Sequence, residues 1–520
     1  MGRYRIDIRK LAYQRSSSFA LHGIHIEIPH DQITLIAGES GCGKTTLLRM
    51  LKKQLHPKMI LEGTILWESE TSVSVEELSY RESAFQIGYV SQQPEMQLVS
   101  DQVWHELAFG LENMGMDQKT MQRRLAETVS FLGLEELYHT PLKELSGGQK
   151  QMLNLASILI MRPKVILLDE PTSQLDPVAR QKFYDLLLQI HQSFDIGMVM
   201  VEHSLEPLLP YCDQIIYLEK GSVAYQGKPE YLYQCSLEHS ALLPFPARYM
   251  QENKRIEEKN AISDHEMRMM MKDQVIHEWK PSKVEGQPVL TCEHMYIRYH
   301  PNQKDILRDL SLQLKEHEIL CLFGGNGSGK TTFLKVLNSK QRKRFGKVDI
   351  KRELRYLPQD PRCLFVKDSL LQEYLQYANI EQIEEIVKTL KLEGLLNQHP
   401  YDISGGELQR AALGLLLLQV EKDVIFLLDE PSKGLDMYHR EQLAKLLRKL
   451  SCHHTILMVS HDVEFAALCA DRCGFLFDGA ITSLQDTRSF FLDNAFYTTY
   501  WRKCTRDHDP CAITYQEVIP

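Results

Sequence analysis

The feature that most constrains this 520-residue chain is that its motifs occur twice, in the same order. The stretch "GESGCGKTT" at 38–46 returns as "GGNGSGKTT" at 324–332, and "LSGGQKQ" at 145–151 returns as "ISGGELQ" at 403–409. "VILLDEP" and "VEH" follow in the first half, and "VIFLLDEP" and "VSH" follow in the second. This order predicts a tandem duplication of one domain type. The chain is also too long for a single hydrophobic core.

Each half alternates β-branched runs such as "ITLIAG" with helical periodicity such as "ARQKFYDLLLQIHQ". Alternating strands and helices predict α/β domains, each with a mainly parallel sheet. We place the first domain at 1–245, a charged and partly helical linker at 246–286, the second domain at 287–500 and a C-terminal tail at 501–520. The methionine-rich "MRMMM" in the linker fits either a stem packed on a domain or a segment that binds a partner.

The two halves differ in length before the glycine pair. Lys44 and Ser146 are 102 residues apart, whereas Lys330 and Ser404 are 74 apart. After these serines, the histidine of "VEH" or "VSH" follows 57 residues later in both halves. The missing residues lie mostly before Gln359, so we expect a trimmed peripheral β region in the second half.

The composition excludes several classes of protein. Charged residues make up 25% and hydrophobic residues 43% of the chain, as in an ordinary soluble protein. The net charge of −9 argues against general nucleic-acid binding. Eleven scattered cysteines without a C-x-x-C pair indicate reduced thiols in a cytosol. We expect no secretory signal, and the apolar run at 411–420 is too short to span a bilayer, so any membrane role is expected to be peripheral.

Both halves contain a match to the phosphate-binding loop G-x-x-x-x-G-K-[ST]. Glycines let the backbone N–H groups wrap a polyphosphate, the lysine neutralises phosphate oxygens, and the threonine hydroxyl binds Mg²⁺. A glycine-rich turn could match by chance, but each match follows an apolar strand and precedes a helix. The predicted nucleotide-binding residues are Gly38, Glu39, Ser40, Gly41, Cys42, Gly43, Lys44, Thr45, Thr46, Gly324, Gly325, Asn326, Gly327, Ser328, Gly329, Lys330, Thr331 and Thr332.

An aspartate–glutamate pair ends an apolar strand in each half, at Asp169–Glu170 and Asp429–Glu430. Carboxylates at the C-terminal edge of a parallel strand face the ligand crevice of an open sheet. We expect the aspartates to hold Mg²⁺ and the glutamates to polarise the attacking water in phosphoryl transfer. A pair of capping acids is the plainer alternative, and the repetition argues against it.

A histidine and a glutamine complete each predicted site. His203 and His461 follow the next strand at matched positions, where they could contact a γ-phosphate; a single histidine there would more often be structural. Gln92 and Gln359 end another strand, where a glutamine can hold Mg²⁺ or water. The predicted metal-binding residues are therefore Thr45, Gln92, Asp169, Thr331, Gln359 and Asp429.

The glycine pairs and two tyrosines supply further candidate nucleotide contacts. A serine and two glycines at the start of a helix offer a hydroxyl and bare N–H groups to an anion. Tyr13 and Tyr299 each stand 31 residues before the loop lysine and could stack on a base, although tyrosine is also common in edge strands. The residues of the glycine pairs are Ser146, Gly147, Gly148, Ser404, Gly405 and Gly406.

This order of motifs resembles the ATP-binding cassette family over almost the whole chain. The resemblance implies two tandem P-loop NTPase domains, each with a mainly parallel sheet, an antiparallel β part and a helical signature subdomain, that hydrolyse ATP with Mg²⁺. In that family two cassettes stack head to tail. Ser146 is then expected to serve the nucleotide on Lys330, and Ser404 the one on Lys44, so one chain would supply both cassettes without forming a homodimer.

A longer stretch, "SQQPEMQLVSDQVWHELAFGLENMG", resembles the ATPases of energy-coupling-factor importers. Gln97, Phe109, Gly110, Glu112 and Asn113 carry this likeness. Overall, the chain looks similar to the fused double cassettes of hydroxymethylpyrimidine or thiamine uptake. The resemblance implies an integral membrane coupling subunit, a separate substrate-binding membrane subunit and a peripheral position on the cytoplasmic face of the cell membrane. An importer ATPase for cobalt or nickel remains an alternative.

Two departures leave open whether the two sites are equally active: Met152 stands where Arg410 keeps the family arginine, and Lys433 matches Ser173. A double-cassette factor acting on ribosomes is the rival class, since "ISGGELQ" and a charged linker fit it. The negative net charge, the mixed-sign linker and "AFGLEN" favour the importer. The cysteine cluster of a ribosome-recycling cassette and the long insertions of a DNA-repair cassette are absent from the sequence.

Overall fold

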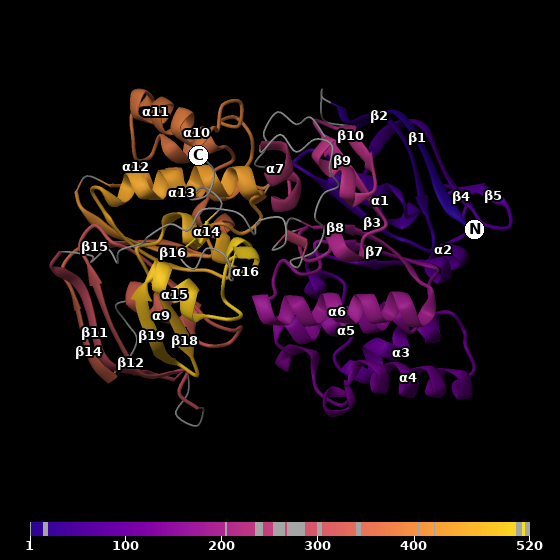
Figure 1. The fold of residues 1–520 in the computed structure, drawn as a ribbon, viewed down its shortest axis with the longest axis horizontal. Helices are drawn as coiled ribbons and strands as arrows, with labels where there is room; N and C mark the ends of the chain where they lie inside the picture. Colours follow the sequence, from indigo (N-terminus) through magenta and orange to yellow (C-terminus); the bar gives the residue numbers. More distant parts are fainter. Residues whose placement is uncertain are drawn as a thin grey trace. The chain divides into compact units, whose positions relative to one another are not determined.

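The computed structural model describes most of the chain and divides it into two compact units, Met1–Met267 and Arg268–Pro520. Each unit is described by itself (Figure 1). Three residues of the predicted sites, His203, Tyr299 and Ser404, lie outside the described residues. The described ranges are 2–13, 19–202, 205–234, 243–252, 266–267, 286–298, 304–339, 345–403, 405–420, 422–505 and 512–514.

The first unit is built on a six-stranded sheet with the order β10-β9-β3-β8-β7-β6. Its neighbours pair in parallel except β9 and β10, which are antiparallel. Every residue of β7 and β8 is buried, as expected of strands covered on both faces. The strands are β3 (Ile33–Gly38), β6 (Ile87–Val90), β7 (Val165–Asp169), β8 (Gly197–Val201), β9 (Gln214–Glu219) and β10 (Ser222–Gly227).

A four-stranded antiparallel sheet of order β2-β1-β4-β5 forms the second β layer of this unit. Alternate residues of β1, beginning Tyr4, Ile6 and Ile8, are buried, which is the pattern of a strand with one face on a core. They share one hydrophobic cluster with the first helix and with β7 and β8. The strands are β1 (Arg3–Tyr13), β2 (Phe19–Pro29), β4 (Met59–Glu68) and β5 (Ser72–Ser74).

The helices of the first unit divide into two groups. Helices α3, α4 and α5 pack around a separate core that includes Val103, Leu107, Val129 and Leu153, and Figure 1 shows α3 and α4 on the side of α5 away from the parallel sheet. The helices are α1 (Lys44–Met50), α2 (Tyr80–Gln86), α3 (Val103–Asn113), α4 (Gln118–Leu132), α5 (Gly147–Leu159), α6 (Pro177–Phe194) and α7 (Phe245–Glu252). Six short 3₁₀ segments among the described residues include η2 (Pro94–Met96).

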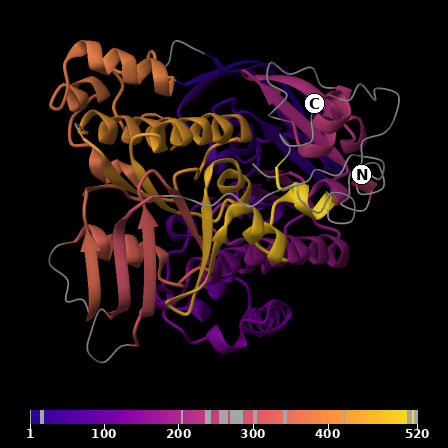
Figure 2. The ribbon, with the colours of Figure 1, turned by 60° about the vertical axis from the view of Figure 1, so that its left-hand side comes forward.

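The second unit repeats the parallel sheet in the same spatial order, β15-β16-β17-β13-β18-β19, with only β18 and β19 antiparallel. Its antiparallel sheet has three strands, β12-β11-β14, which Figure 2 shows side by side. The described residues contain no counterpart of β5 or α2, in line with the trimmed β region that the spacing predicted. The strands are β11 (Pro288–Ile297), β12 (Leu307–Lys315), β13 (Ile319–Phe323), β14 (Phe345–Ile350), β15 (Glu353–Leu357), β16 (Val424–Asp429), β17 (Thr455–Val459), β18 (Arg472–Phe477) and β19 (Ala480–Asp486).

The helices of the second unit follow the same plan. A small helical part consists of α10, α11 and α12, the helix that begins at the glycine pair. The helix at the predicted tail is packed, because Trp501 and Cys504 are buried. These helices are α9 (Lys330–Asn338), α10 (Leu370–Tyr374), α11 (Ile380–Leu390), α12 (Gly405–Leu418), α13 (Met437–Ser451), α14 (Val463–Cys469), α15 (Thr487–Asp493) and α16 (Tyr500–Thr505). The predicted fold class, two tandem α/β units with mainly parallel sheets, is confirmed.

Two predictions made from composition can be compared with the structure. Within the described ranges, no helix is both long enough and apolar enough to cross a membrane. Nine cysteines of the described ranges are thiols outside any disulfide.

Candidate nucleotide-hydrolysis site

The phosphate loop joins the end of a central strand to the start of a helix in each unit. In the first unit β3 ends at Gly38 and α1 begins at Lys44. The Lys44 ammonium donates to the backbone carbonyls of Gly38 and Glu39, both at 2.8 Å. Lys330 repeats this geometry with the carbonyls of Gly324 at 2.8 Å and Gly325 at 3.1 Å. The loop lysine therefore lies across its own loop, where it can exchange carbonyl oxygens for phosphate oxygens.

The first glycine of each loop is required by its surroundings. Gly38 has φ 140°, and a Cβ there would lie 2.2 Å from the carbonyl oxygen of Leu218. Gly324 has φ 153°, and a Cβ there would lie 2.3 Å from the carbonyl oxygen of Leu476. Only glycine fits this conformation and this approach of two backbones. The tight turn leaves the next N–H groups to converge on an anion at the helix N-terminus.

The predicted metal-binding threonine and aspartate lie side by side in the first unit. Thr45 Oγ1 donates to Asp169 Oδ1 at 2.9 Å, and the Tyr89 hydroxyl donates to Asp169 Oδ2 at 3.0 Å. The Arg49 guanidinium lies 3.7 Å from the same Oδ2. Asp169 is buried, and this burial raises the pKa of its carboxyl group. Hard oxygen ligands of this kind suit Mg²⁺.

The second unit builds the same arrangement from matched residues. Thr331 Oγ1 donates to Asp429 Oδ1 at 3.0 Å, and the Tyr356 hydroxyl donates to Asp429 Oδ2 at 3.2 Å. Burial again raises the pKa of the aspartate. We did not predict the two tyrosines from the sequence. Each stands three residues before the predicted glutamine, in "YVSQ" and "YLPQ", so the repeat contained the signal.

Both predicted glutamates directly follow their strands in a left-handed backbone conformation. The φ angle is 47° at Glu170 and 53° at Glu430, in a region that residues other than glycine rarely adopt. The Glu170 N–H donates to the Val201 carbonyl at 2.9 Å, and the Glu430 N–H donates to the Val459 carbonyl at 3.0 Å. Strained residues of this kind, each costing about 1–3 kcal/mol, cluster at functional sites.

Among the described residues, the Glu170 carboxylate contacts Gln92, and the Glu430 carboxylate contacts His461. Gln92 Nε2 donates to Glu170 Oε2 at 2.6 Å. The His461 backbone N–H donates to Glu430 Oε2 at 3.1 Å, and its ring Nε2 lies 3.5 Å from Oε1. Burial raises the pKa of Glu430 to about 7. Gln359 is exposed and, within the described residues, has no hydrogen bond to Glu430.

The first glycine pair begins helix α5, as predicted. Ser146 is the N-cap residue: its hydroxyl accepts from the Gln149 N–H at 3.3 Å, and its own N–H donates to Gln149 Oε1 at 2.8 Å. Ser146 and Gly147 are exposed, so this helix start faces outward. Gly405 and Gly406 begin α12 in the second unit.

Tyr13 lies beside the phosphate loop of its own unit. Its hydroxyl is 2.8 Å from Thr46 Oγ1, and its side chain remains 39% exposed. This position is compatible with stacking on a nucleotide base, which stays a prediction.

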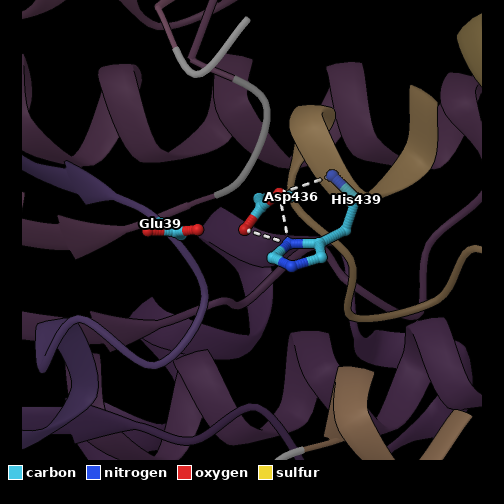
Figure 3. A group of neighbouring side chains, drawn as sticks. All are labelled: Glu39, Asp436 and His439. Carbon is cyan, nitrogen blue, oxygen red and sulfur yellow. Dashed lines mark hydrogen bonds and ion pairs between the residues drawn. The ribbon is translucent and has the colours of Figure 1, made fainter. Parts of the chain in front are cut away.

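An aspartate six residues after each glutamate caps the next helix, and this pair was not predicted from the sequence. Asp176 accepts from the Ala179 N–H at 2.9 Å and starts α6. Asp436 accepts from the His439 N–H at 2.9 Å and starts α13, while the ring Nδ1 of His439 lies 2.8 and 2.9 Å from the two Asp436 oxygens (Figure 3). The repeated "LD" after each glutamate could have shown it.

A buried glutamate shapes the loop after each predicted glutamine. Glu106 Oε2 accepts from the N–H groups of Val99 and Ser100, at 3.0 and 2.8 Å. Glu373 Oε2 accepts from Val366 and Lys367, at 2.8 and 2.9 Å. Both glutamates are buried, and each stands seven residues after the valine that it holds. This repeat was not predicted from the sequence.

The importer-like stretch of the first unit has an inward side and an outward side. Gln97 turns inward, because its side chain accepts from the Ser91 N–H at 3.1 Å and donates to the Tyr89 carbonyl at 2.7 Å. Phe109 is 43% exposed on α3, which disagrees with a role as core alone. The exposed large apolar side chains of this stretch are Met96, Val99, Trp104 and Phe109.

Together, the phosphate loop, the paired threonine and aspartate, and the glutamate at the strand end define each unit as a P-loop ATPase domain. The ABC transporter family model matches residues 21–173 and 307–433, more than half of the chain. The chain therefore belongs to the ABC transporter ATP-binding family and hydrolyses ATP in a reaction coupled to transport.

Relatives agree with this assignment over the full length. A protein of Bacillus thuringiensis named as an ABC transporter ATP-binding protein is 38% identical over 540 residues, covering 99% of this chain and 97% of the relative. A protein of Bacillus subtilis named for the import of HMP or thiamine is 28% identical, covering 95% of this chain and 94% of the relative. The likeness to both relatives thus extends over nearly the whole chain.

Among solved structures, an archaeal ribosome recycling factor, aABCE1, shows the same tandem fold. It has a TM-score of 0.59 at 20% identity, covering 93% of this chain and 90% of that chain. CbiO1 of Clostridium perfringens, part of the ABC transporter complex CbiONQ, is 29% identical over 44% of this chain and 90% of that chain, with a TM-score of 0.40.

Proposed function

We propose that the chain is the ATPase subunit of an energy-coupling-factor type importer that takes up a vitamin or its precursor, hydroxymethylpyrimidine or thiamine. The carrying observation is the exposed apolar side chains on and before α3, in a stretch that resembles importers of this type. The name of the Bacillus subtilis relative supports the cargo. On this proposal the chain acts at the cytoplasmic face of the cell membrane, with an integral coupling subunit and a separate substrate-binding membrane subunit.

The docking surface in this proposal consists of Met96, Val99, Trp104 and Phe109 of the first unit. Apolar side chains with 37–81% exposure are unusual for a purely solvent-facing loop and helix. A short amphipathic helix of a partner could cover them by apolar packing with a polar rim. Because the surface begins four residues after Gln92, movement of a bound partner would reach the side chain that holds Glu170.

Hydrolysis is proposed to follow from the residues of each unit. Lys44 and the loop N–H groups bind the polyphosphate, and Tyr13 offers a face for the base. Mg²⁺ fits the oxygen set of Thr45, Asp169 and Gln92, where it would neutralise phosphate charge. Glu170, oriented by Gln92, polarises the attacking water. Lys330, Thr331, Asp429 and Glu430 perform these steps in the second unit.

The serine of each glycine pair is proposed to act on the nucleotide of the other unit. Ser146→Arg should then disable the site of Lys330 and spare the site of Lys44, because a bulky cation would replace a hydroxyl and bare N–H groups. Photo-crosslinking of labelled ATP at each site measures this. Loss confined to the Lys44 site would contradict the head-to-tail arrangement.

Phe109→Ala tests the transport role. We expect ATPase activity of the purified chain to persist, while copurification with the membrane subunits and vitamin uptake both fall. Phe477→Ala is the matched control, since this phenylalanine is also exposed but belongs to β18 of the second unit. Normal assembly and uptake with Phe109→Ala would overturn the docking surface.

The same preparation separates the alternatives. Uptake assays with labelled hydroxymethylpyrimidine, thiamine, cobalt and nickel assign the cargo among the importer types. Cosedimentation with ribosomes instead of membranes would overturn the importer proposal and leave the ATPase assignment intact.

A further inference from the structure

A buried carboxylate directly after β8 is not used by the steps proposed above. Glu202 is 5% exposed, and its Oε1 accepts from the Thr172 N–H at 3.2 Å and from the Thr172 hydroxyl at 2.8 Å. The Tyr184 hydroxyl lies 3.0 Å from Thr172 Oγ1. Because the Thr172 hydroxyl donates its proton to Glu202, the Tyr184 hydroxyl is left as a donor toward Thr172 Oγ1 or the Glu202 carboxylate. Burial raises the pKa of Tyr184, which keeps its proton available for this bond.

This chain of hydrogen bonds holds the loop that carries Glu170. Thr172 stands two residues after Glu170, and the loop then continues to the Asp176 cap of α6. The Glu170 N–H is already bonded to the carbonyl of Val201, the residue before Glu202. The loop is therefore attached to the end of β8 at two successive points. Two attachments can fix the direction of a residue whose own backbone conformation is unfavourable.

The second unit carries other residues at the matched positions. Ser460 occupies the position of Glu202, and its hydroxyl accepts from the Asp462 N–H at 3.0 Å, within its own loop. Ser432 and Ala444 match Thr172 and Tyr184. Here the glutamate itself is held, through the His461 N–H on Glu430 Oε2. A carboxylate at this position is thus a feature of the first unit.

We propose that Glu202 is a positioning residue of the first ATP site, and that its carboxylate orients Glu170 by holding Thr172. The inference rests on the proposed role of Glu170 in hydrolysis. Glu202 itself contacts neither nucleotide nor water in this proposal. Its loss should lower the turnover number and leave the binding of ATP largely unchanged, because the phosphate loop lies on a different segment.

The test uses the full chain with Glu430→Gln as the background, so that turnover depends on Glu170. Glu202→Ser, which installs the residue of the second unit, should lower kcat about tenfold with KM within about twofold, as expected when a catalytic group is misdirected. Glu202→Gln retains an oxygen that can accept from Thr172 and should keep kcat within about threefold of the background. In the reverse background, Glu170→Gln, the Glu202→Ser change should leave turnover unchanged.

A second variant guards against misfolding. Thr172→Val preserves the shape of the side chain and removes only the hydroxyl, so it should lower kcat in the same direction as Glu202→Ser. Circular dichroism and ATP binding check the fold of each variant. Unchanged kcat in both variants, or equal losses with Glu202→Ser and Glu202→Gln, would overturn the positioning role alone. Full turnover of the Glu170→Gln, Glu430→Gln double variant would instead overturn the role of Glu170 and this inference with it.

Discussion

The two units agree where they would touch phosphate and differ where they hold loops. The threonine–aspartate bond is 2.9 Å in one unit and 3.0 Å in the other, and the tyrosine–aspartate bonds are 3.0 and 3.2 Å. Outside this shared geometry the units differ. The second unit has Ser460 at the position of Glu202, and Gln92 contacts Glu170 whereas Gln359 is exposed. The first group of contacts is thus the same in both units, and the second group differs between them.

The surfaces beside the two glutamine loops show the largest divergence. Helix α3 has 11 residues and carries Trp104 and Phe109, whereas α10 has 5 residues, and the exposed apolar side chains around it are Val366, Leu375 and Tyr377. Two differently built surfaces should prefer two different helices of a membrane subunit. On the importer proposal, this difference favours one fixed orientation of the chain on its membrane partner.

The largest expected effect tests whether the two glutamates act alike. Glu170→Gln and Glu430→Gln together should slow hydrolysis by about 10²–10³-fold or more while ATP still binds, because water positioning is lost and the phosphate cradle remains. Lys44→Ala and Lys330→Ala should instead weaken ATP binding. Steady-state ATPase assays and equilibrium binding of a labelled nucleotide measure both. If Glu170→Gln and Glu430→Gln, each made alone, differ strongly in turnover, the two sites are unequal despite their matched geometry. A double variant with the turnover of the parent would disprove the role of the glutamates in hydrolysis.

The residues of the repeated core of the site could be proposed from the sequence, because each motif has its own local geometry. The glycines, lysine and threonine of a phosphate loop are adjacent in the chain, and strand ends bring the acids to the same edge. The spacing also predicted a trimmed β region in the second half, where the antiparallel sheet has three strands instead of four. Local patterns of this kind can be recognised in a sequence without knowledge of the tertiary contacts.

Other residues could not be assigned from local patterns because their partners are distant in sequence. Tyr89 is 80 residues from Asp169, and Thr172 is 30 residues from Glu202. Pairing of parallel strands brings them together, and only the fold specifies which side chains meet. Gln97 shows the reverse case, since a residue that carried the importer likeness turns inward to close its own loop.

The next effect concerns acid stability and should appear in the first unit only. His30 is buried against Trp67, with ring centroids 3.8 Å apart, and against Tyr4. Neither ring nitrogen has a hydrogen-bond partner among the described residues. Burial, assisted by the nearby Lys164, lowers the pKa of His30 to about 4. The matched position of the second unit is Glu316.

The direction of this pH effect on stability follows from proton binding. Between pH 6.5 and about 4 the unfolded chain binds a proton at His30 that the folded chain does not, so stability is complete above pH 6.5 and falls as the pH decreases. The full loss is about 3 kcal/mol, since each pKa unit is worth about 1.4 kcal/mol. His30→Phe should remove this part of the acid sensitivity, measured by urea unfolding at pH 7 and pH 5. His25→Gln, at an exposed histidine of β2, the strand that ends just before His30, is the control; equal pH dependence in the parent and His30→Phe would refute the prediction.

A smaller effect is expected from the glutamates that shape the two exposed loops. Glu106→Ala leaves the N–H groups of Val99 and Ser100 without their acceptor and should destabilise the first unit by about 1–3 kcal/mol. Glu373→Ala should do the same in the second unit, because the geometry is repeated there. Denaturant unfolding measures the loss, and hydrogen exchange of these amides locates it. Slow exchange at Val99 and Ser100 in Glu106→Ala would show that the carboxylate does not hold the loop, and Glu106→Gln, which keeps an acceptor, should lie between the parent and the alanine variant.

The smallest effect concerns the contact between each glutamine loop and its glycine-pair region. In the first unit, Lys150 on α5 forms an ion pair with Glu95 of η2. In the second, Arg362 of η8 (Pro361–Leu364) lies over the ring of Tyr401, 5.9 Å from its centroid. Glu95 is 70% exposed, so the ion pair should contribute no more than about 1 kcal/mol, and less in high salt.

A charge-swap experiment distinguishes the effect of this ion pair from the effect of general surface charge. Glu95→Lys alone should lower ATPase stimulation by the membrane subunits at low salt, because two cations would then separate the loop from α5. Adding Lys150→Glu should restore it, since the pair is re-formed with its direction reversed. Raising the salt concentration should diminish the first effect. If the double variant is no better than the single one, the coupling runs through the backbone of the loop, and the ion pair would be a difference between the units without functional consequence.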